Sequence, residues 1–199
     1  RPPVVLTTVP LVADLVGRVN ARRWVYYCVD DWATWPGLDH RTLSAMEAKL
    51  LQRVDAVAAV SPPLQQAMSA AGHSPTLITH GVDVAMWREP RADQPAEHPT
   101  LRALAQLPKP LALFWGMIDR KIDRRALREL ASRWPGSIAL VGPRNHEADD
   151  LPPIDRIHLF DPVDHHVLPR CAAEANVLIM PYFNGCRSMA WAQPLKLLE

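Results

Sequence analysis

Three short segments of the sequence place charged, aromatic or glycine residues directly after apolar runs of the kind that form strands. The first is Asp30-Asp31-Trp32, which follows the aromatic run Trp24–Val29. Carboxylates accept hydrogen bonds from hydroxyl groups, and indole rings pack against apolar surfaces. The segment therefore predicts a site for a hydroxyl-rich ligand. The alternative is that Asp30 and Asp31 only begin a turn or cap a local amide.

The second segment, Gly116–Lys121, follows the apolar run Leu111–Trp115. Eight basic and three acidic residues lie between positions 109 and 144, in a chain whose net charge is only +1. Glycine allows close backbone approach, a helix N-terminus attracts anions, and Arg120 and Lys121 add positive charge. We therefore predict a phosphate or diphosphate site, although neither a GxGxxG fingerprint nor a P-loop is present. The alternative is that the arginines beyond this loop only line a solvated helix face.

The third segment is the predicted helix start Pro194–Glu199, which follows a strand-like run ending at Met180–Tyr182. Free amides at a helix start bind phosphate, which makes Pro194 and Leu195 candidate ligands. The carboxylate of Glu199 can accept two hydrogen bonds from the hydroxyl groups of a ribose or another sugar. The alternative is a surface ion pair between Lys196 and Glu199 across one helical turn.

The histidines and cysteines indicate neither a metal centre nor a disulfide framework. His165 and His166 are adjacent, so they point apart, and with Asp161, Asp164 and Cys171 they match no zinc-ligand spacing. We therefore predict no metal site. The three cysteines are odd in number and far apart, which is typical of a reducing compartment, and no secretory signal opens the chain.

Strand-like and helix-like segments alternate along the chain, and these elements must position the three segments. Predicted strands cover residues 4–8, 24–29, 55–60, 76–79, 111–115, 138–141, 156–160 and 177–180. Predicted helices cover residues 10–20, 39–54, 61–72, 123–134, 167–175 and 194–199. The strands are apolar throughout, which is typical of parallel sheets covered on both faces. Ligands bind beyond the carboxyl ends of such strands, where the three segments fall.

A Pro-rich stretch without periodicity divides this alternation into two parts. We predict the second half of one Rossmann-like domain over 1–87, a linker over 88–109, and the first half of another domain over 110–199. The predicted fold class is α/β, with two incomplete Rossmann-like domains. The sequence begins without methionine and ends within a predicted helix, which favours an internal fragment. Although 48% of the residues are apolar, no apolar run approaches the ~20 residues of a membrane span.

Several of these motifs, in this order and spacing, resemble the GT-B glycosyltransferases. The motifs of the first half are Val25–Trp32, Val60–Leu64 and His80–Asp83. Those of the second half are Phe114–Asp123, Leu140–Pro143, Val177–Tyr182 and Pro194–Glu199. The chain is most similar to the family-four, group-one type, in the bacterial branch that makes cell-wall or exported polysaccharides. This resemblance implies retaining transfer of a sugar from a UDP- or GDP-linked donor, in a cleft between two domains, with no metal or other cofactor.

The resemblance also implies roles for individual residues of the second half. Gly116 matches the glycine in the first loop of the family's C-terminal domain, and Lys121, with Arg120, matches its basic diphosphate ligand. Gly142 ends the next matching strand and belongs to the same donor site. Glu199 matches the second carboxylate of the family's glutamate pair, which holds the donor ribose.

The implied donor site also includes the start of the last predicted helix, but it lacks one carboxylate of the family. Pro194 and Leu195, with the neighbouring Lys196, match the helix start whose amides approach the phosphates. The first glutamate of the family's pair is missing, because Trp191 occupies its position.

On the acceptor side, the sequence departs from the family in a second way. A histidine often follows the strand that matches Trp24–Val29, whereas this chain has Asp30 there. Asp30 is therefore the predicted catalytic residue, and we expect Asp31 and Trp32 to lie beside it on the acceptor side.

The leading hypothesis is a metal-independent glycosyltransferase acting on a glycan or lipid-linked acceptor in cell-envelope polysaccharide synthesis. We expect it in the cytoplasm, at the inner face of the membrane, with peripheral membrane contact left open and no nucleic acid as partner. Two alternatives remain from the same residues. One is a non-catalytic nucleotide-sugar-binding module, and the other is a Rossmann-type sugar epimerase.

Overall fold

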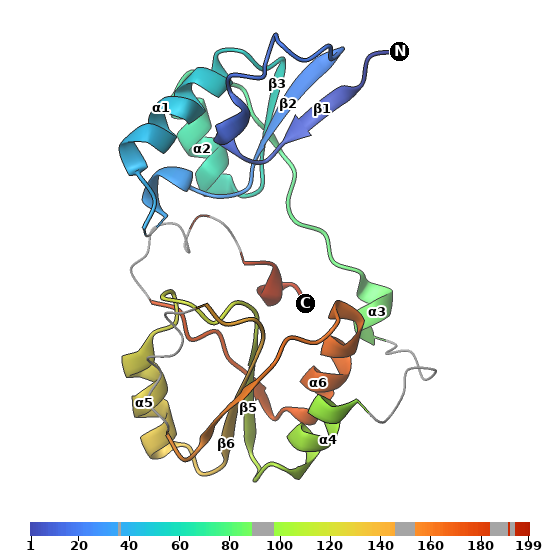
Figure 1. Cartoon of the computed structure of the whole chain (residues 1–199), viewed down its shortest axis with the longest axis vertical. Coiled ribbons are helices and arrows are strands. Elements are labelled where there is room, and N and C mark those ends of the chain that lie inside the picture. The colour runs from blue at the N-terminus through green and yellow to red at the C-terminus, as the bar shows by residue number, and fades with distance from the viewer. Residues whose placement is uncertain (36, 89–97, 146–153, 184–190, 192–193) are drawn as a thin grey trace. The chain divides into compact units, whose positions relative to one another are not determined.

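The computed structural model describes residues 1–35, 37–88, 98–145, 154–183, 191 and 194–199 (Figure 1). Its contacts divide the chain into two compact units. Unit 1 contains the described part of residues 1–82 together with residues 191 and 194–198. Unit 2 contains the described part of residues 83–183 together with Glu199.

Unit 1 is built on a four-stranded parallel sheet with the strand order β1-β2-β3-β4. The strands are β1 (Val4–Thr7), β2 (Arg23–Cys28), β3 (Ala56–Ala59) and β4 (Thr76–Leu77). The helices are α1 (His40–Leu51) and α2 (Pro62–Ala70), with short 3-10 turns η1 (Pro10–Val12) and η2 (Trp32–Thr34). Both α-helices pack with β2 and β3 in one apolar cluster.

Local sequence begins both helices of unit 1 at defined residues. Asp39 accepts hydrogen bonds from the amides of Arg41 and Thr42 at 3.1 and 3.2 Å, and Ser61 accepts one from Leu64 at 3.4 Å. These caps satisfy amides that the first helical turn leaves without a partner. The buried cluster beneath the helices includes Tyr26, Cys28, Leu50, Ala59, Val60 and Leu64.

Unit 2 contains a second four-stranded parallel sheet, with the strand order β7-β6-β5-β8. The strands are β5 (Leu111–Trp115), β6 (Ser137–Val141), β7 (Ile157–Phe160) and β8 (Val177–Leu178). The helices are α3 (Val84–Arg88), α4 (Pro99–Gln106), α5 (Arg124–Arg133) and α6 (Leu168–Glu174), and the 3-10 turn η4 (His165–Val167) precedes α6.

The two central strands of unit 2, β5 and β6, are buried at every position. Leu113 and Trp115 belong to the apolar cluster that includes residues of α4 and α6. Ala112 and Phe114 belong to the cluster that includes residues of α5. Figure 1 shows α5 on one side of these strands and α4 and α6 on the other. Covering on both faces explains why the strands are apolar throughout, and the predicted α/β fold with two Rossmann-like parallel sheets is confirmed.

The helix predicted over 10–20 is wrong. Only the single 3-10 turn Pro10–Val12 forms there, and non-helical turns follow it. Leu11 and Leu15, whose spacing suits one face of a helix, are 63% and 46% exposed. Gly17 has a φ of 85°, which is incompatible with a right-handed helix. The helical spacing of the apolar residues over 10–20 therefore does not correspond to a helix.

The Pro-rich stretch 88–109, predicted as a linker, contains helix α4. Pro99 stands in the first turn, where its missing N–H breaks no hydrogen bond, and the ring of His98 accepts from the amide of Thr100 at 3.2 Å. Leu104 is fully buried in the core of unit 2. Pro99 therefore begins helix α4, which packs on the core of unit 2, and does not mark an unstructured linker at this point.

The helix predicted over 194–199 is the short 3-10 turn η5 (Leu195–Leu197). Its i→i+3 geometry is seen in the bond from the amide of Leu197 to the carbonyl of Pro194, at 3.0 Å. The longest described helix, α1, has 12 residues. None of the helices in the described ranges has the length and apolar character needed to cross a bilayer.

Two glycines at the ends of β5 and β6 bring backbones into direct contact. Gly116 and Gly142 have φ angles of 132° and 153°, which side-chain-bearing residues rarely adopt. A Cβ atom on Gly142 would lie 2.0 Å from the carbonyl oxygen of Gly116. That distance is far below van der Waals contact, so neither loop can keep its path if residue 142 carries a side chain.

We expect Gly142→Ala to destabilise the chain by about 3 kcal/mol, because the methyl group meets fixed backbone in a disfavoured conformation. Thermal unfolding of the variant and the parent chain measures this difference. Gly72→Ala is a control for conformation alone, since Gly72 has a φ of +90° but no atom within 4 Å of the added Cβ. Gly81→Ala has neither a positive φ nor a nearby atom and should change stability by less than about 0.5 kcal/mol. Equal losses in all three variants would contradict the contact argument.

Candidate functional site

The loops that follow β5 and β6 run side by side at the carboxyl edge of the unit 2 sheet. The amide of Gly116 donates to the carbonyl of Val141 at 2.9 Å, and the amide of Ile118 donates to the carbonyl of Pro143 at 2.9 Å. The structure thus brings together Gly116 and Gly142, two residues of the predicted donor site. At this contact the two loops are so close that a side chain on Gly142 does not fit between them.

The basic pair predicted to bind diphosphate lies in the loop between β5 and α5. Asp119 Oδ1 accepts from the amide of Lys121 at 2.8 Å, and the carbonyl of Lys121 accepts from the amide of Phe183 at 3.0 Å. The backbone of Lys121 is therefore tied on both sides. Arg120 is exposed and Lys121 is half-buried, so both side chains have access to the surface.

Acidic side chains also take part in this loop. Asp123 begins α5 and accepts from the amide of Ala126 at 2.9 Å, which occupies one of the free amides of that helix start. Burial, together with the smaller effect of the Asp119 charge, raises the pKa of the Tyr182 hydroxyl to about 12. Tyr182 is therefore a neutral group at physiological pH. An anion at this helix start would meet the remaining amides and the two basic side chains.

Glu199 lies at the end of β5 in a cluster with His165, Trp87 and Trp115, which we call the Glu199 cluster. Trp115 Nε1 donates to Glu199 Oε2 at 3.1 Å, and His165 Nε2 lies 2.8 Å from Glu199 Oε1. The Glu199 side chain is only 5% exposed, whereas that of His165 is 60% exposed. Trp87 stacks on Trp115 at a centroid distance of 5.4 Å.

This geometry fixes the orientation of the carboxylate that was predicted to hold ribose. Among the described residues, each oxygen of Glu199 has one partner, and a carboxylate oxygen can accept a second hydrogen bond. His165 is the solvent-exposed one of the two partners. Sequence reasoning gave His165 no such role, since it lies 34 positions from Glu199. Among the described residues, no group of three or more His, Cys, Asp or Glu side chains is arranged to hold a metal ion.

The remaining predicted donor residues belong to unit 1 by their contacts. Pro194, Leu195 and Lys196 form the start of η5, and Leu195 is 39% exposed. Trp191, in the place of the family's first glutamate, packs against the apolar cluster of unit 1, and its carbonyl accepts a hydrogen bond from the Ser61 hydroxyl. A tryptophan there supplies packing and no carboxylate.

The predicted acceptor-side residues follow β2 in unit 1. Asp30 Oδ1 accepts from the amide of Asp31 at 3.0 Å, so one oxygen does cap a local amide. The carbonyl of Asp31 accepts from the amide of Thr34 at 3.0 Å, and Trp32 Nε1 donates to the carbonyl of Thr8 at 3.1 Å. These bonds hold the segment in place, and the catalytic role of Asp30 stays a prediction.

A half-buried carboxyl group that sequence reasoning missed lies beside this segment. Tyr26 Oη donates to Glu47 Oε1 at 2.5 Å, and Cys28 Sγ lies 3.9 Å from the same oxygen. We call Tyr26, Cys28 and Glu47 the Glu47 cluster. The signal was available, because Glu47 stands four residues after Leu43 and three before Leu50 on the buried face of α1.

Burial dominates the titration of the Glu47 cluster. It raises the pKa of Glu47, and the negative charge of Asp31 raises it further, while the hydrogen bond from Tyr26 acts in the opposite direction. Burial likewise raises the pKa of the Cys28 thiol to about 12 and moves the pKa of Tyr26 above its usual range. Both groups are therefore neutral at physiological pH. Tyr26 donates to Glu47, whereas the thiol proton of Cys28 has two acceptors within reach, Glu47 Oε1 and the carbonyl of Asp30.

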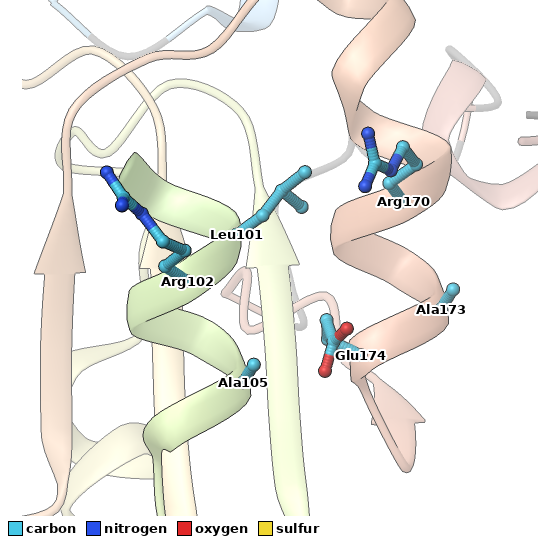
Figure 2. Close-up of a pocket in the computed structure, with 6 residues that line it drawn as sticks. All are labelled: Leu101, Arg102, Ala105, Arg170, Ala173 and Glu174. Atoms are coloured by element: carbon cyan, nitrogen blue, oxygen red, sulfur yellow. The ribbon is translucent and has the colours of Figure 1, made fainter. Parts of the chain in front are cut away.

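A groove of about 220 Å³ lies between α4 and α6 and contains none of the predicted site residues. Figure 2 shows the guanidinium groups of Arg102 and Arg170 near one end, with the carboxylate of Glu174 further along the groove. Lys109 Nζ also lies 3.7 Å from Glu174. Charges of both signs therefore border the groove, and it lacks the single-sign character of an anion site. Its lining consists of Leu101, Arg102, Ala105, Arg170, Ala173 and Glu174.

Comparison with known proteins finds similarity at the level of the fold. No protein-family model matches the chain, and no curated protein sequence matches it. The crystal structure of HepE from Anabaena in complex with UDP matches with a TM-score of 0.61 and 16% identity, covering 96% of this chain and 57% of HepE. HepE in complex with UDP and glucose gives a TM-score of 0.65 at 14% identity, covering 95% and 56%.

Two other proteins share this fold. A Listeria monocytogenes protein described as a UDP-N-acetylglucosamine 2-epimerase matches with a TM-score of 0.52 and 16% identity, covering 89% of this chain and 51% of that one. The lipopolysaccharide outer core galactosyltransferase WaaB, in its apo form, matches with a TM-score of 0.50 and 12% identity, covering 89% and 49%. The chain thus has a GT-B-like fold and spans about half the length of these proteins.

Replacing Glu47 by Gln should change the pH dependence of stability in a defined direction. A carboxyl group whose pKa is raised by folding stabilises the fold below its unfolded value, near 4.5, and this contribution is lost as the pH rises through the folded value. The stability of Glu47→Gln relative to the parent chain should therefore increase as the pH rises above about 4.5 and then level off. Urea unfolding between pH 4 and 8 measures this difference.

The control is Glu129→Gln, because Glu129 is exposed and pairs with Arg133 on the surface of α5 at 3.0 Å. A surface pair of this kind contributes little to stability. A Glu47→Gln difference that is constant across the pH range would contradict the raised pKa.

Proposed function

We propose that the chain is part of a glycosyltransferase that moves a sugar from a nucleotide-sugar donor to a glycan or lipid-linked acceptor. The observation that carries this proposal is the composition of the carboxyl end of β5. There the glycine loop leads to Arg120 and Lys121, and Trp115 holds the carboxylate of Glu199. A basic loop suits a diphosphate, and an oriented carboxylate suits a ribose diol.

The donor we favour is UDP-linked, with a GDP-linked donor as the alternative. Support comes from the fold shared with HepE, which was crystallised with UDP and with UDP and glucose. In our proposal, Arg120 and Lys121 neutralise the leaving diphosphate together with loop amides and amides from the segment Pro194–Lys196. Charge that develops on the leaving group is stabilised best by groups that are already in place, which the tied backbone of Lys121 provides.

We further propose that the acceptor hydroxyl binds beside Asp30, with Asp31 and Trp32 in the same acceptor site. Transfer would retain the anomeric configuration and need no metal, with protein cations neutralising the diphosphate instead. Its place would be cell-envelope polysaccharide synthesis in the cytoplasm, at the inner face of the membrane. These assignments follow from the family resemblance of the motifs.

A second candidate, a sugar epimerase, is favoured by the fold shared with the Listeria protein described as an epimerase. A non-catalytic nucleotide-sugar-binding module is favoured by Trp191, which packs against the unit 1 core where the family has a carboxylate. The full-length protein separates the three when it is incubated with UDP- and GDP-sugars, with and without envelope lipid extract. Release of nucleoside diphosphate with a glycosylated product supports transfer, whereas an epimer formed without acceptor supports the epimerase. Binding without either product supports the module.

Two substitutions test the donor site in the full-length protein. Lys121→Ala should weaken the binding of UDP about ten- to a hundredfold and leave uridine binding nearly unchanged, because it removes a charged contact to the diphosphate. Glu199→Ala should weaken UDP and uridine by similar factors, because both contain the ribose. Isothermal calorimetry with the two ligands measures these ratios.

The matched control is Arg128→Ala, an exposed cation of α5 outside the proposed site. It should leave the affinities for UDP and uridine within about twofold, since an exposed charge is screened by solvent and salt. Equal losses of UDP and uridine in Lys121→Ala would exclude the diphosphate assignment. Unchanged uridine binding in Glu199→Ala would exclude the ribose assignment.

A further inference from the structure

Glu47 combines features that a purely structural glutamate does not need. Its Oε1 accepts a hydrogen bond from Tyr26 Oη at 2.5 Å, and Cys28 Sγ lies 3.9 Å from the same oxygen. The single thiol proton of Cys28 can point either to this oxygen or to the carbonyl of Asp30, which lies 3.5 Å from Sγ. Within the described ranges, Oε2 receives no hydrogen bond, and the one fully buried polar side-chain atom without a partner is Trp87 Nε1. Since Oε2 has no partner within these ranges and is not among the fully buried atoms, it is exposed to solvent. Glu47 can therefore exchange a proton with water.

The Glu47 cluster is connected to the strand end that carries the predicted catalytic residue. Cys28 is the last residue of β2, and its Sγ lies 3.5 Å from the carbonyl oxygen of Asp30 as well as 3.9 Å from Glu47 Oε1. Asp30 Oδ1 in turn accepts from the amide of Asp31. The thiol of Cys28 therefore lies between Glu47 and the backbone of Asp30, and the Asp30 side chain continues to the amide of Asp31.

Among the described residues, the groups that shift the pKa of Glu47 come from β2 and from Asp31, three residues after its end. Tyr26 and Cys28 are neutral donors, and Asp31 carries the nearby negative charge. An ionised Glu47 makes stronger hydrogen bonds to these donors than a neutral one, because charge-assisted hydrogen bonds are about twice as strong. The protonation state of Glu47 thus controls how firmly the end of β2 is held.

We propose that Glu47 is a positioning residue of the acceptor-side site, whose ionised carboxylate holds Tyr26 and thereby the end of β2 that leads into the segment Asp30–Trp32. This inference rests on the proposed glycosyl transfer and adds a residue that neither the family resemblance nor the motif pattern supplies. Glu47 acts through β2 and does not touch the donor. Its effect should appear in kcat and in the acceptor KM, and the donor KM should stay within about twofold.

The test is the pH profile of kcat for the full-length enzyme and four variants. The parent enzyme should lose activity as the pH falls through the raised pKa of Glu47. Glu47→Gln keeps the shape and an acceptor oxygen, so it should fold, show about fivefold lower kcat at neutral pH, and lack this acid limb. Glu129→Gln, the exposed control on α5, should keep the parent profile.

Two further variants shift the acid limb in opposite directions. Tyr26→Phe removes a hydrogen bond that lowers the pKa of Glu47, so the limb should move to higher pH. Asp31→Asn removes a charge that raises this pKa, so the limb should move to lower pH, whatever the height of the activity plateau. A glutamate that only supports folding would produce neither shift.

The outcomes separate this inference from the proposed function. Absence of sugar transfer by the parent enzyme would overturn the proposed function. Transfer by the parent, with the acid limb still present in Glu47→Gln or unmoved in the other two variants, would overturn the role of Glu47 alone. Loss of all activity in Glu47→Gln would also overturn the positioning role, since it would make the carboxylate indispensable to the reaction itself.

Discussion

The geometry of the candidate donor site depends on the contact between the backbones of Gly116 and Gly142. Parallel pairing of β5 and β6 does not stop at the strand ends, because the amides of Gly116 and Ile118 continue it in the loops. A side chain at position 142 would separate these loops, since its first carbon would lie 2.0 Å from a carbonyl oxygen. The path of the loop up to Lys121 therefore follows from two residues that have no side chain.

The same strand also fixes the carboxylate of the site. Trp115 is the residue directly before Gly116, and its backbone is held in β5 while its indole donates to Glu199. Stacking with Trp87 and burial in the apolar cluster of α4 and α6 restrict the indole to one orientation. The end of β5 thus sets both the path of the glycine loop and the direction of Glu199. A change in the packing of β5 against its helices would therefore alter the loop and the carboxylate together.

Sequence reasoning succeeded where burial is uniform and failed where a partner is distant. The central strands β5 and β6 of unit 2 were predictable, because strands covered on two faces are apolar at nearly every position. The helix at Pro99 was missed, since a first-turn proline and a linker proline look alike until Leu104 is known to be buried. The pairing of His165 with Glu199 was beyond prediction, because only the folded chain brings positions 34 residues apart together.

Glu47 differs from these cases, because its position on α1 could have revealed it. A carboxylate on the buried face of an amphipathic helix must find donors or be destabilising in its ionised form. One of its oxygens accepts from a neutral phenol and lies beside a neutral thiol, and the charge that acts on it, that of Asp31, has the same sign as its own. Burial and like charge thus oppose the ionised state that the hydrogen bonds favour, so its protonation responds to small changes around β2. Such a group contributes little to the stability of the fold. Its change of charge can instead alter the hydrogen bonding at the end of β2, which leads to Asp30 and Asp31.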